Sequence, residues 1–150
     1  MIKIVEGDLL AGSEYLIGHQ VNCQGAMGSG IAKQIRARYP QVYDSYAAYC
    51  RAQKPEQLLG DCQFVEADNR IVANLFGQLH YGRQAKRYTD YEALSRALRT
   101  FKEYAQETGA ACALPYMIGC GLANGEWHVV ENRLQDIFSD YPLTLYRYGG

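Results

Sequence analysis

The sequence lacks several features that would place it in a common class. No apolar run approaches the ~18 residues of a membrane-spanning helix, and the N-terminal MIKIVEGD has no signal-peptide core. The five cysteines are scattered without a CxxC pair, so neither disulfides nor a zinc site is supported. Neither sign of charge is in excess, since 15 Lys and Arg stand against 16 Asp and Glu; this balance argues against binding nucleic acid by bulk electrostatics. We therefore expect a cytoplasmic protein that has no metal site and does not bind membranes.

What is present suits one domain. At 150 residues with 48% hydrophobic content, the chain can build one sizeable core, and we expect a single domain over residues 1–150. Strand-like runs alternate with helical patterns, except that the runs at 63–66 and 70–76 are joined by the turn formers Ala67-Asp68-Asn69. This order predicts an α/β fold, a three-layer sandwich whose six-stranded mixed sheet has helices on both faces. The expected strands cover residues 2–5, 15–21, 63–66, 70–76, 110–115 and 143–148, with about four helices among them.

Local signals predict some helix ends. Thr89, with Glu92 three residues later, fits a capping box, so Thr89 is the expected N-cap. Gly109 is the expected stop of the same helix. Pro40 separates two helical patterns, and Pro55 to Gly60 is expected to be a turn.

The most informative stretch is YLIGHQVNCQGAMGSGIAKQIRAR at residues 15–38, which indicates a buried strand, a glycine-rich loop and a helix. Gly25, Gly28 and Gly30 allow backbone N–H groups to approach a ligand closely. The helix that begins near Gly30 adds free N–H donors and the positive end of its dipole, so an anion such as phosphate is favoured. A second loop of this kind, MIGCGLANG at residues 117–125, also follows an apolar strand. One such loop is weak evidence because glycine turns often serve packing, but two at one sheet edge suit a diphosphate.

The first loop lacks the features of two other nucleotide-binding motifs. No Lys-Ser or Lys-Thr follows the glycines, so it is not a Walker A loop. The glycines of GAMGSG have the order G-x-x-G-x-G rather than that of the dinucleotide-binding fingerprint. Neither ATP hydrolysis nor hydride transfer is favoured.

Three motifs in order closely resemble the macrodomains that bind ADP-ribose. They are Gly7-Asp8-Leu9, HQVNCQGAMGSGIA at residues 19–32 and LPYMIGCGL at residues 114–122, and together they span most of the chain. The HxxNCQG segment is most similar to the branch that contains the yeast-type ADP-ribose 1″-phosphate phosphatase, the terminal ADP-ribose protein glycohydrolase and phage-encoded relatives. The resemblance implies a monomer that uses no cofactor and acts on ADP-ribose or on ADP-ribosylated protein, nucleic acid or small molecules.

The resemblance also implies roles for individual residues. Asp8 would accept a hydrogen bond from the adenine amino group, with the Leu9 backbone beside the base and Tyr148 against its face. Asn22 would hold the distal ribose, with Gln24 nearby. The other implied contacts come from the two loops: Gly28, Gly30 and Ile31 around the distal ribose and proximal phosphates, and Ile118, Gly119, Cys120, Gly121 and Leu122 as donors to the diphosphate.

The sequence departs from the family pattern at the catalytic positions. The glycohydrolase branch has a lysine in the loop after the fourth strand and an aspartate directly after GCGL. Here that loop begins Phe76-Gly77-Gln78, with Lys86 further along, and Ala123 follows the second motif. A covalent lysine mechanism is therefore not expected.

The remaining candidates for catalysis are Asn22 and His19, with His19 as acid or base. A histidine in an apolar strand is alternatively a satisfied core group, and Cys23 is a packing residue unless a nearby cation lowers its pKa. The basic and aromatic run from Tyr81 to Arg87 either clamps a terminal phosphate or forms a solvated face. Two functions stay open: hydrolysis of a group on the distal ribose, with ADP-ribose 1″-phosphate as the first candidate substrate, and binding of ADP-ribose without turnover.

Overall fold

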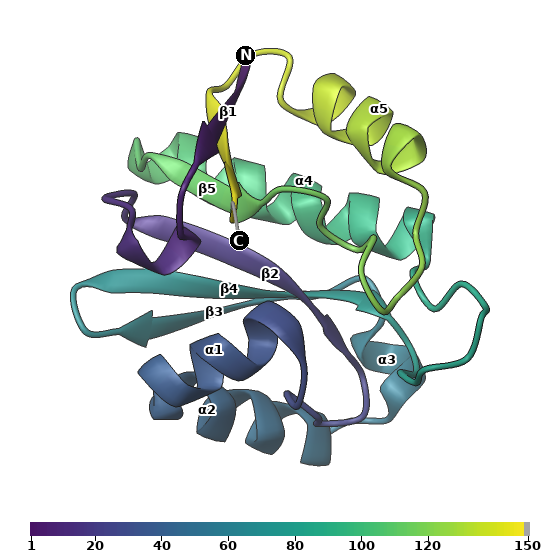
Figure 1. Ribbon diagram of the computed structural model, residues 1–150. Coiled ribbons are helices and arrows are strands. Elements are labelled where there is room, and N and C mark those ends of the chain that lie inside the picture. The colour runs from purple at the N-terminus through teal and green to yellow at the C-terminus, as the bar shows by residue number, and fades with distance from the viewer. Residues whose placement is uncertain (149–150) are drawn as a thin grey trace.

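The computed structural model describes residues 1–148 and confirms the α/β prediction. A six-stranded sheet is flanked by helices on both faces (Figure 1). The strands are β1 (Ile2–Glu6), β2 (Leu16–Asn22), β3 (Cys62–Ala67), β4 (Arg70–Gln78), β5 (Cys112–Pro115) and β6 (Leu143–Arg147). The helices are α1 (Gly30–Arg38), α2 (Pro40–Arg51), α3 (Pro55–Leu58), α4 (Tyr91–Thr108) and α5 (Trp127–Ile137), with the short 3₁₀ helix η1 at Leu9–Ala11.

The strand order is β1-β6-β5-β2-β4-β3. Only the predicted β3–β4 hairpin is antiparallel among the described strands, so the carboxyl ends of the other five lie at one edge. The pairing of β2 with β5 covers just two residue pairs, Leu16 with Cys112 and Ile17 with Ala113. Beyond these pairs the two strands no longer bond to each other. Open α/β sheets bind ligands in the crevice outside such carboxyl ends, at the point where the strand order reverses.

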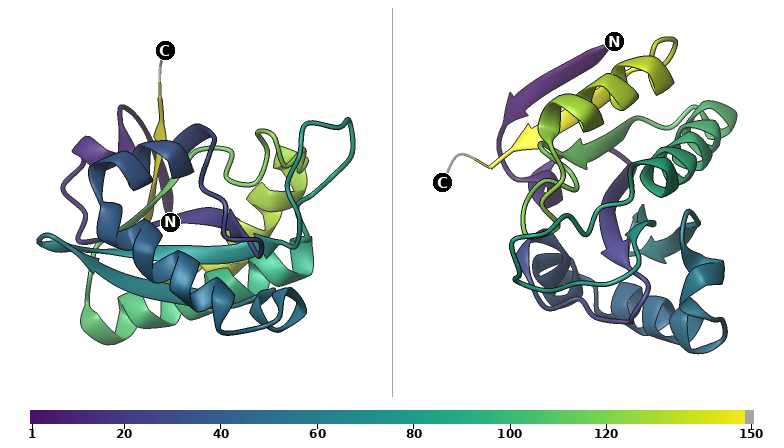
Figure 2. Two further views of the ribbon diagram at one scale, coloured as in Figure 1. Left: turned by 90° about the horizontal axis from the view of Figure 1, so that it is seen from below. Right: turned by 90° about the vertical axis from the view of Figure 1, so that its right-hand side faces the viewer.

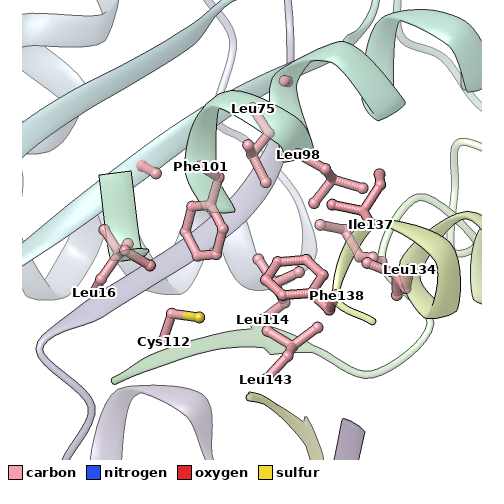
Figure 3. Packing of buried hydrophobic residues seen from close by; sticks show 14 of the residues in the cluster. Leu16, Leu75, Leu98, Phe101, Cys112, Leu114, Leu134, Ile137, Phe138 and Leu143 are labelled. Carbon is pink, nitrogen blue, oxygen red and sulfur yellow. The ribbon is translucent and has the colours of Figure 1, made fainter. Parts of the chain in front are cut away.

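Each face of the sheet carries its own apolar core. Helices α4 and α5 cover one face, and α1 and α2 cover the other (Figures 1 and 2). On the first face, Phe101 and Leu98 of α4 pack with Leu134 and Phe138 of the α5 segment against the strands (Figure 3). Gly18 of β2 has no room for a β-carbon there, because one would lie 2.9 Å from the side chains of both Leu114 and Phe101. These two cores hold the central strand β2 rigidly and so fix the start of the first glycine loop.

Three boundary predictions were wrong. The N-cap of α4 is Asp90, whose carboxylate accepts from the Ala93 N–H at 3.0 Å, because Thr89 is still extended and bridges to Gln78. The expected turn after Pro55 contains the one-turn helix α3, since proline is well placed at a helix start. Strand β5 begins at Cys112 rather than residue 110, because the Ala110 N–H still bonds to Ala105 of α4.

Other predicted boundaries are confirmed. Gly109 ends α4 in the left-handed conformation, with φ of 69°, and Pro40 begins α2. Among residues 1–148, no helix is long and apolar enough to cross a membrane.

Candidate ligand-binding cleft

A cleft of about 620 Å³ opens at the carboxyl edge of the sheet, where β2 and β5 separate. One wall is the first glycine loop and the start of α1, and the opposite wall is the second glycine loop. The segment after β4 closes a third side with Tyr81, Gly82 and Arg83. The structure thus brings together both glycine loops, as the sequence predicts for a diphosphate site.

Asn22 lines the cleft and braces the loop that follows it. Its side-chain Nδ2 donates to the Ala26 carbonyl at 2.8 Å, and its Oδ1 accepts from the Gln24 N–H at 2.9 Å. The buried Tyr46 hydroxyl of α2 also lies 2.6 Å from the Asn22 carbonyl and 2.9 Å from its Oδ1. One N–H of the Asn22 amide therefore remains for a ligand, since an amide nitrogen carries two donors.

The start of α1 presents uncapped donors to the cleft. Ser29 is the N-cap residue, but its side chain makes no capping hydrogen bond. The first N–H groups of a helix have no partner within it, and Gly30, Ile31 and Ala32 all line the cleft. Gly30 has φ of +57°, and a β-carbon at Gly28 or Gly30 would meet only open space. This wall is a helix N-terminus left free for an anion.

The second glycine loop supplies a second set of donors. Ile118, Gly119, Gly121 and Leu122 line the cleft, and their backbone N–H groups have no acceptor among residues 1–148. Gly119 has φ of +78°, a conformation that glycine adopts without strain. The N–H of Cys120 is different, because it donates to the Met117 carbonyl at 2.9 Å. Cys120 itself does not line the cleft, so its predicted role as a donor is not supported by the geometry.

Carboxylates are absent from the segments that build the cleft. All of its lining residues fall within residues 15–43, 69–89 and 108–125, and none of these three segments contains Asp or Glu. The same segments carry seven of the 15 Lys and Arg residues: Lys33, Arg36, Arg38, Arg70, Arg83, Lys86 and Arg87. Of these seven, Arg83 lines the cleft, so the one charged side chain of the lining is positive, which favours an anionic ligand.

The residues expected at the adenine end lie beyond the cleft, along the same sheet edge. Asp8 follows β1 and accepts from the Leu10 N–H at 2.9 Å, capping η1, while Leu9 is buried. Tyr148 directly follows β6, and its side chain is 71% exposed. These segments are adjacent, since the Gly7 N–H donates to the Arg147 carbonyl at 2.9 Å. Asp8 and Tyr148 thus extend the row of strand ends, but neither lines the cleft.

The structure does not bring His19 to the cleft. His19 is fully buried on the α2 side of the sheet, and its Nε2 lies 2.7 Å from Asn74 Oδ1. Asn74 bonds onward to Gln63, which donates to the Ser45 carbonyl of α2. Burial lowers the pKa of His19 to about 4, opposed by the Asn74 bond, so the ring is neutral near pH 7. The interpretation as a core histidine fits this geometry, and the catalytic assignment does not.

The cysteines show no sign of activation. Burial raises the pKa of the Cys23 thiol to about 12, with smaller contributions from Cys50 and Asp61. Burial likewise raises the pKa of Cys120 to about 11. A nucleophilic cysteine needs a lowered pKa, so both are packing residues.

Other expected residues lie near the cleft without lining it. Gln24 is exposed and donates from Nε2 to the Leu79 carbonyl at 2.9 Å, which ties the first loop to the segment after β4. Lys86 places its ammonium 5.2 Å from the Tyr88 ring centroid and is not a lining residue. It therefore does not replace the lysine of the glycohydrolase branch.

The sequence interpretation missed four polar lining residues: Gln20, Ser29, Gln78 and Tyr116. Gln20 and Gln78 stand close to the carboxyl ends of β2 and β4. Polar residues late in otherwise apolar strands were the available signal, because strand ends form the ligand edge.

The macro domain family model matches residues 19–134 of the chain. The chain belongs to the macro domain family. This macrodomain is 29% identical over 146 residues to a DNA ADP-ribosyl glycohydrolase of Mycobacterium tuberculosis, with 95% of the chain aligned to 40% of that longer protein. It is 26% identical over 177 residues to an ADP-ribose 1″-phosphate phosphatase of Debaryomyces hansenii, covering 97% of the chain and 98% of the relative. A solved macrodomain protein from Streptomyces coelicolor superposes with a TM-score of 0.81 at 31% identity, over 99% of this chain and 100% of that one.

The macrodomain cleft holds few groups that can transfer a proton. Its lining contains no Asp, Glu, His, Lys or Cys, and its titratable side chains are Tyr81, Tyr116 and Arg83. Within residues 1–148 there is also no group of three or more His, Cys, Asp or Glu side chains able to hold a metal.

Proposed function

We propose that this macrodomain binds ADP-ribose and hydrolyses a group attached to its distal ribose. Two sets of unpaired N–H groups carry the proposal. One set comes from the start of α1 and the other from residues 118, 119, 121 and 122, and both line a cleft without carboxylates. Two such cradles match a diphosphate. The relatives named as an ADP-ribose 1″-phosphate phosphatase and a DNA ADP-ribosyl glycohydrolase support the same ligand.

The proposed residue roles follow the geometry. Gly28, Gly30 and Ile31 surround the distal ribose and proximal phosphates, and Ile118, Gly119, Gly121 and Leu122 donate to the diphosphate. Asn22 directs its one spare N–H to the distal ribose. Asp8, Leu9 and Tyr148 hold the adenine end beyond the cleft.

Catalysis in this proposal consists of positioning and electrostatic stabilisation. For ADP-ribose 1″-phosphate, a water oxygen attacks the phosphorus and the bond from phosphorus to O1″ breaks, which gives ADP-ribose and inorganic phosphate. Since the lining offers no carboxylate, histidine or lysine, a non-bridging oxygen of that phosphate takes the proton from the water, and a proton passes from the phosphate to O1″ as it leaves. ADP-ribose 1″-phosphate is the favoured substrate, with ester- or base-linked ADP-ribose as the near alternative.

A second function is supported by the same lining. The absence of a protein acid or base from the cleft equally suits a module that binds ADP-ribose without turnover. The protein is expected to work as a monomer without a cofactor in either case.

The test is to incubate the protein with ADP-ribose 1″-phosphate, an ADP-ribosylated glutamate peptide and ADP-ribosylated DNA, and to measure ADP-ribose affinity by calorimetry. Gly121→Glu serves as the control for contaminating activity, because it obstructs the cleft. Consumption of one substrate by the wild type, at a clearly higher rate than by the control below saturation, supports the hydrolase. Tight binding with no consumption supports the module, and no binding refutes both.

A further inference from the structure

The floor of the cleft contains a polar network that joins four separate segments. Gln20 of β2 donates from Nε2 to Gln78 Oε1 at 2.8 Å and to Thr89 Oγ1 at 2.9 Å. Thr89 in turn donates to the Gly119 carbonyl of the second glycine loop at 2.7 Å. Gln78 donates to the His80 carbonyl at 2.8 Å. The network therefore connects the central strand, the segment after β4, the start of α4 and the second loop.

The orientation of the Gln20 amide is fixed by these partners. The Thr89 hydroxyl uses its one proton on the Gly119 carbonyl, so it must accept from Gln20. Gln78 uses its own amide nitrogen on His80, so its oxygen also accepts. Gln20 Oε1 is consequently left buried without a hydrogen-bond partner among the described residues. An unsatisfied buried oxygen lowers stability, which calls for a compensating role.

The carbonyl that this network reaches sets the conformation of the second loop. The Gly119 carbonyl accepts from the Thr89 hydroxyl and from the Gly125 N–H at 2.9 Å. Neither Thr89 nor Gly125 lines the cleft. Both lone pairs of the carbonyl are thereby occupied by donors outside the cleft, while the N–H groups of Gly119 and Gly121 stay unpaired and available to the ligand.

We infer that Gln20 and Thr89 are positioning residues, which hold the second glycine loop in the conformation that binds the diphosphate. The identity of the ligand in this inference rests on the proposed ADP-ribose function. The claim that Gln20 and Thr89 hold the loop does not depend on it. The loop keeps its shape in the free protein because the bonds from Gln20 to Thr89 and from Thr89 to the Gly119 carbonyl form without ligand. Preorganisation of this kind strengthens binding by avoiding the cost of ordering the loop.

The test uses two substitutions that remove the network without changing volume greatly. Thr89→Val removes the hydroxyl and Thr89→Ser retains it, while Gln20→Met removes the amide with its unpaired oxygen. Thr100→Val is a control for the substitution itself, because Thr100 is exposed and its hydroxyl donates to the Arg96 carbonyl of its own helix at 3.3 Å, away from the network.

Calorimetry should show ADP-ribose binding about 10-fold weaker in Thr89→Val and Gln20→Met, and near wild type in Thr89→Ser and Thr100→Val. Gln20→Met should nevertheless unfold at the wild-type temperature or above, since it also removes an unpaired buried oxygen. A purely structural role would instead lower stability and affinity together. Such a joint loss in Gln20→Met, or unchanged affinity in both variants, would overturn the inference.

Hydrogen–deuterium exchange in the absence of ligand separates this inference from the proposed function. Amides of residues 118–125 should exchange faster in Thr89→Val than in the wild type or Thr100→Val. If the wild type fails to bind ADP-ribose, the proposed function fails, yet faster exchange would still support the positioning role. Unchanged exchange in that segment would refute it.

Discussion

Gly121 offers a direct probe of the diphosphate cradle, because the free protein should tolerate a side chain there. Its φ lies outside the left-handed region, and a β-carbon would find nothing within 4 Å. Gly121→Gln and Gly121→Glu should therefore leave the unfolding temperature close to that of the wild type. Any loss of affinity then reports on the ligand rather than on folding.

The two variants differ only in charge. A carboxylate about 4 Å from a phosphate costs ~1 kcal/mol at the dielectric constant of water and ~4 kcal/mol at an effective value of 20. Gly121 is exposed at the mouth of the cleft, so the true cost lies between these limits. Gly121→Glu should bind ADP-ribose at least ~5-fold more weakly than Gly121→Gln.

The assay is calorimetry of ADP-ribose at low and high salt. The gap between the two variants should narrow as salt rises, since the Debye length falls from about 10 Å at 0.1 M to about 3 Å at 1 M. Wild-type affinity in a folded Gly121→Glu protein would show that this loop is not the cradle. A gap that does not respond to salt would mean that shape, not charge, is responsible.

Three other predictions test the remaining roles. Asp8→Ala should weaken ADP-ribose binding by ~1.5–3 kcal/mol, and a wild type that binds the guanine analogue equally well would reject the adenine contact. Asn22→Ala should lower turnover more than it weakens binding of the product ADP-ribose, because positioning matters most in the transition state; equal losses in kinetics and calorimetry would place its effect in binding alone. His19 has a folded pKa of about 4, below its ordinary 6.5, so its contribution to stability is complete above pH 6.5 and is lost as the pH falls toward 4. Urea unfolding should show ~3 kcal/mol of this dependence in the wild type and not in His19→Gln.

Much of the cleft was predictable because its signals are local. Glycines before a helix indicate free N–H donors wherever they occur, and Gly28, Gly30, Gly119 and Gly121 all belong to the two loops facing the cleft. The parallel strands then place both loops at one edge without further information.

The surroundings of His19 and Gln20 depend on distant residues and could not be predicted. Regular alternation puts positions 19 and 22 on opposite faces of a strand. The structure has a register shift between Val21 and Asn22, after which Asn22 contacts Tyr46 of α2. This shift does not bring His19 to the cleft. The ring stays in the core, where it is hydrogen-bonded to Asn74, which lies 55 positions away in the sequence.

The N-cap error at α4 has the same origin. Thr89 and Asp90 are both good cap residues by type, and the local pattern favoured Thr89. The hydroxyl of Thr89 instead donates a hydrogen bond to the Gly119 carbonyl, 30 positions along the chain. A tertiary contact thus decided between two locally acceptable caps.

The separation of charge within the chain has a kinetic consequence. Because Arg83 is the one charged residue of the cleft lining and all 16 carboxylates lie outside the three segments that build it, an approaching anion meets positive charge at the cleft and negative charge only elsewhere. Long-range steering of this type raises the association rate and leaves the dissociation rate largely unchanged. The association rate of ADP-ribose or of a larger polyanion should therefore fall as salt is added. The protein would show this salt dependence although its net charge is close to zero.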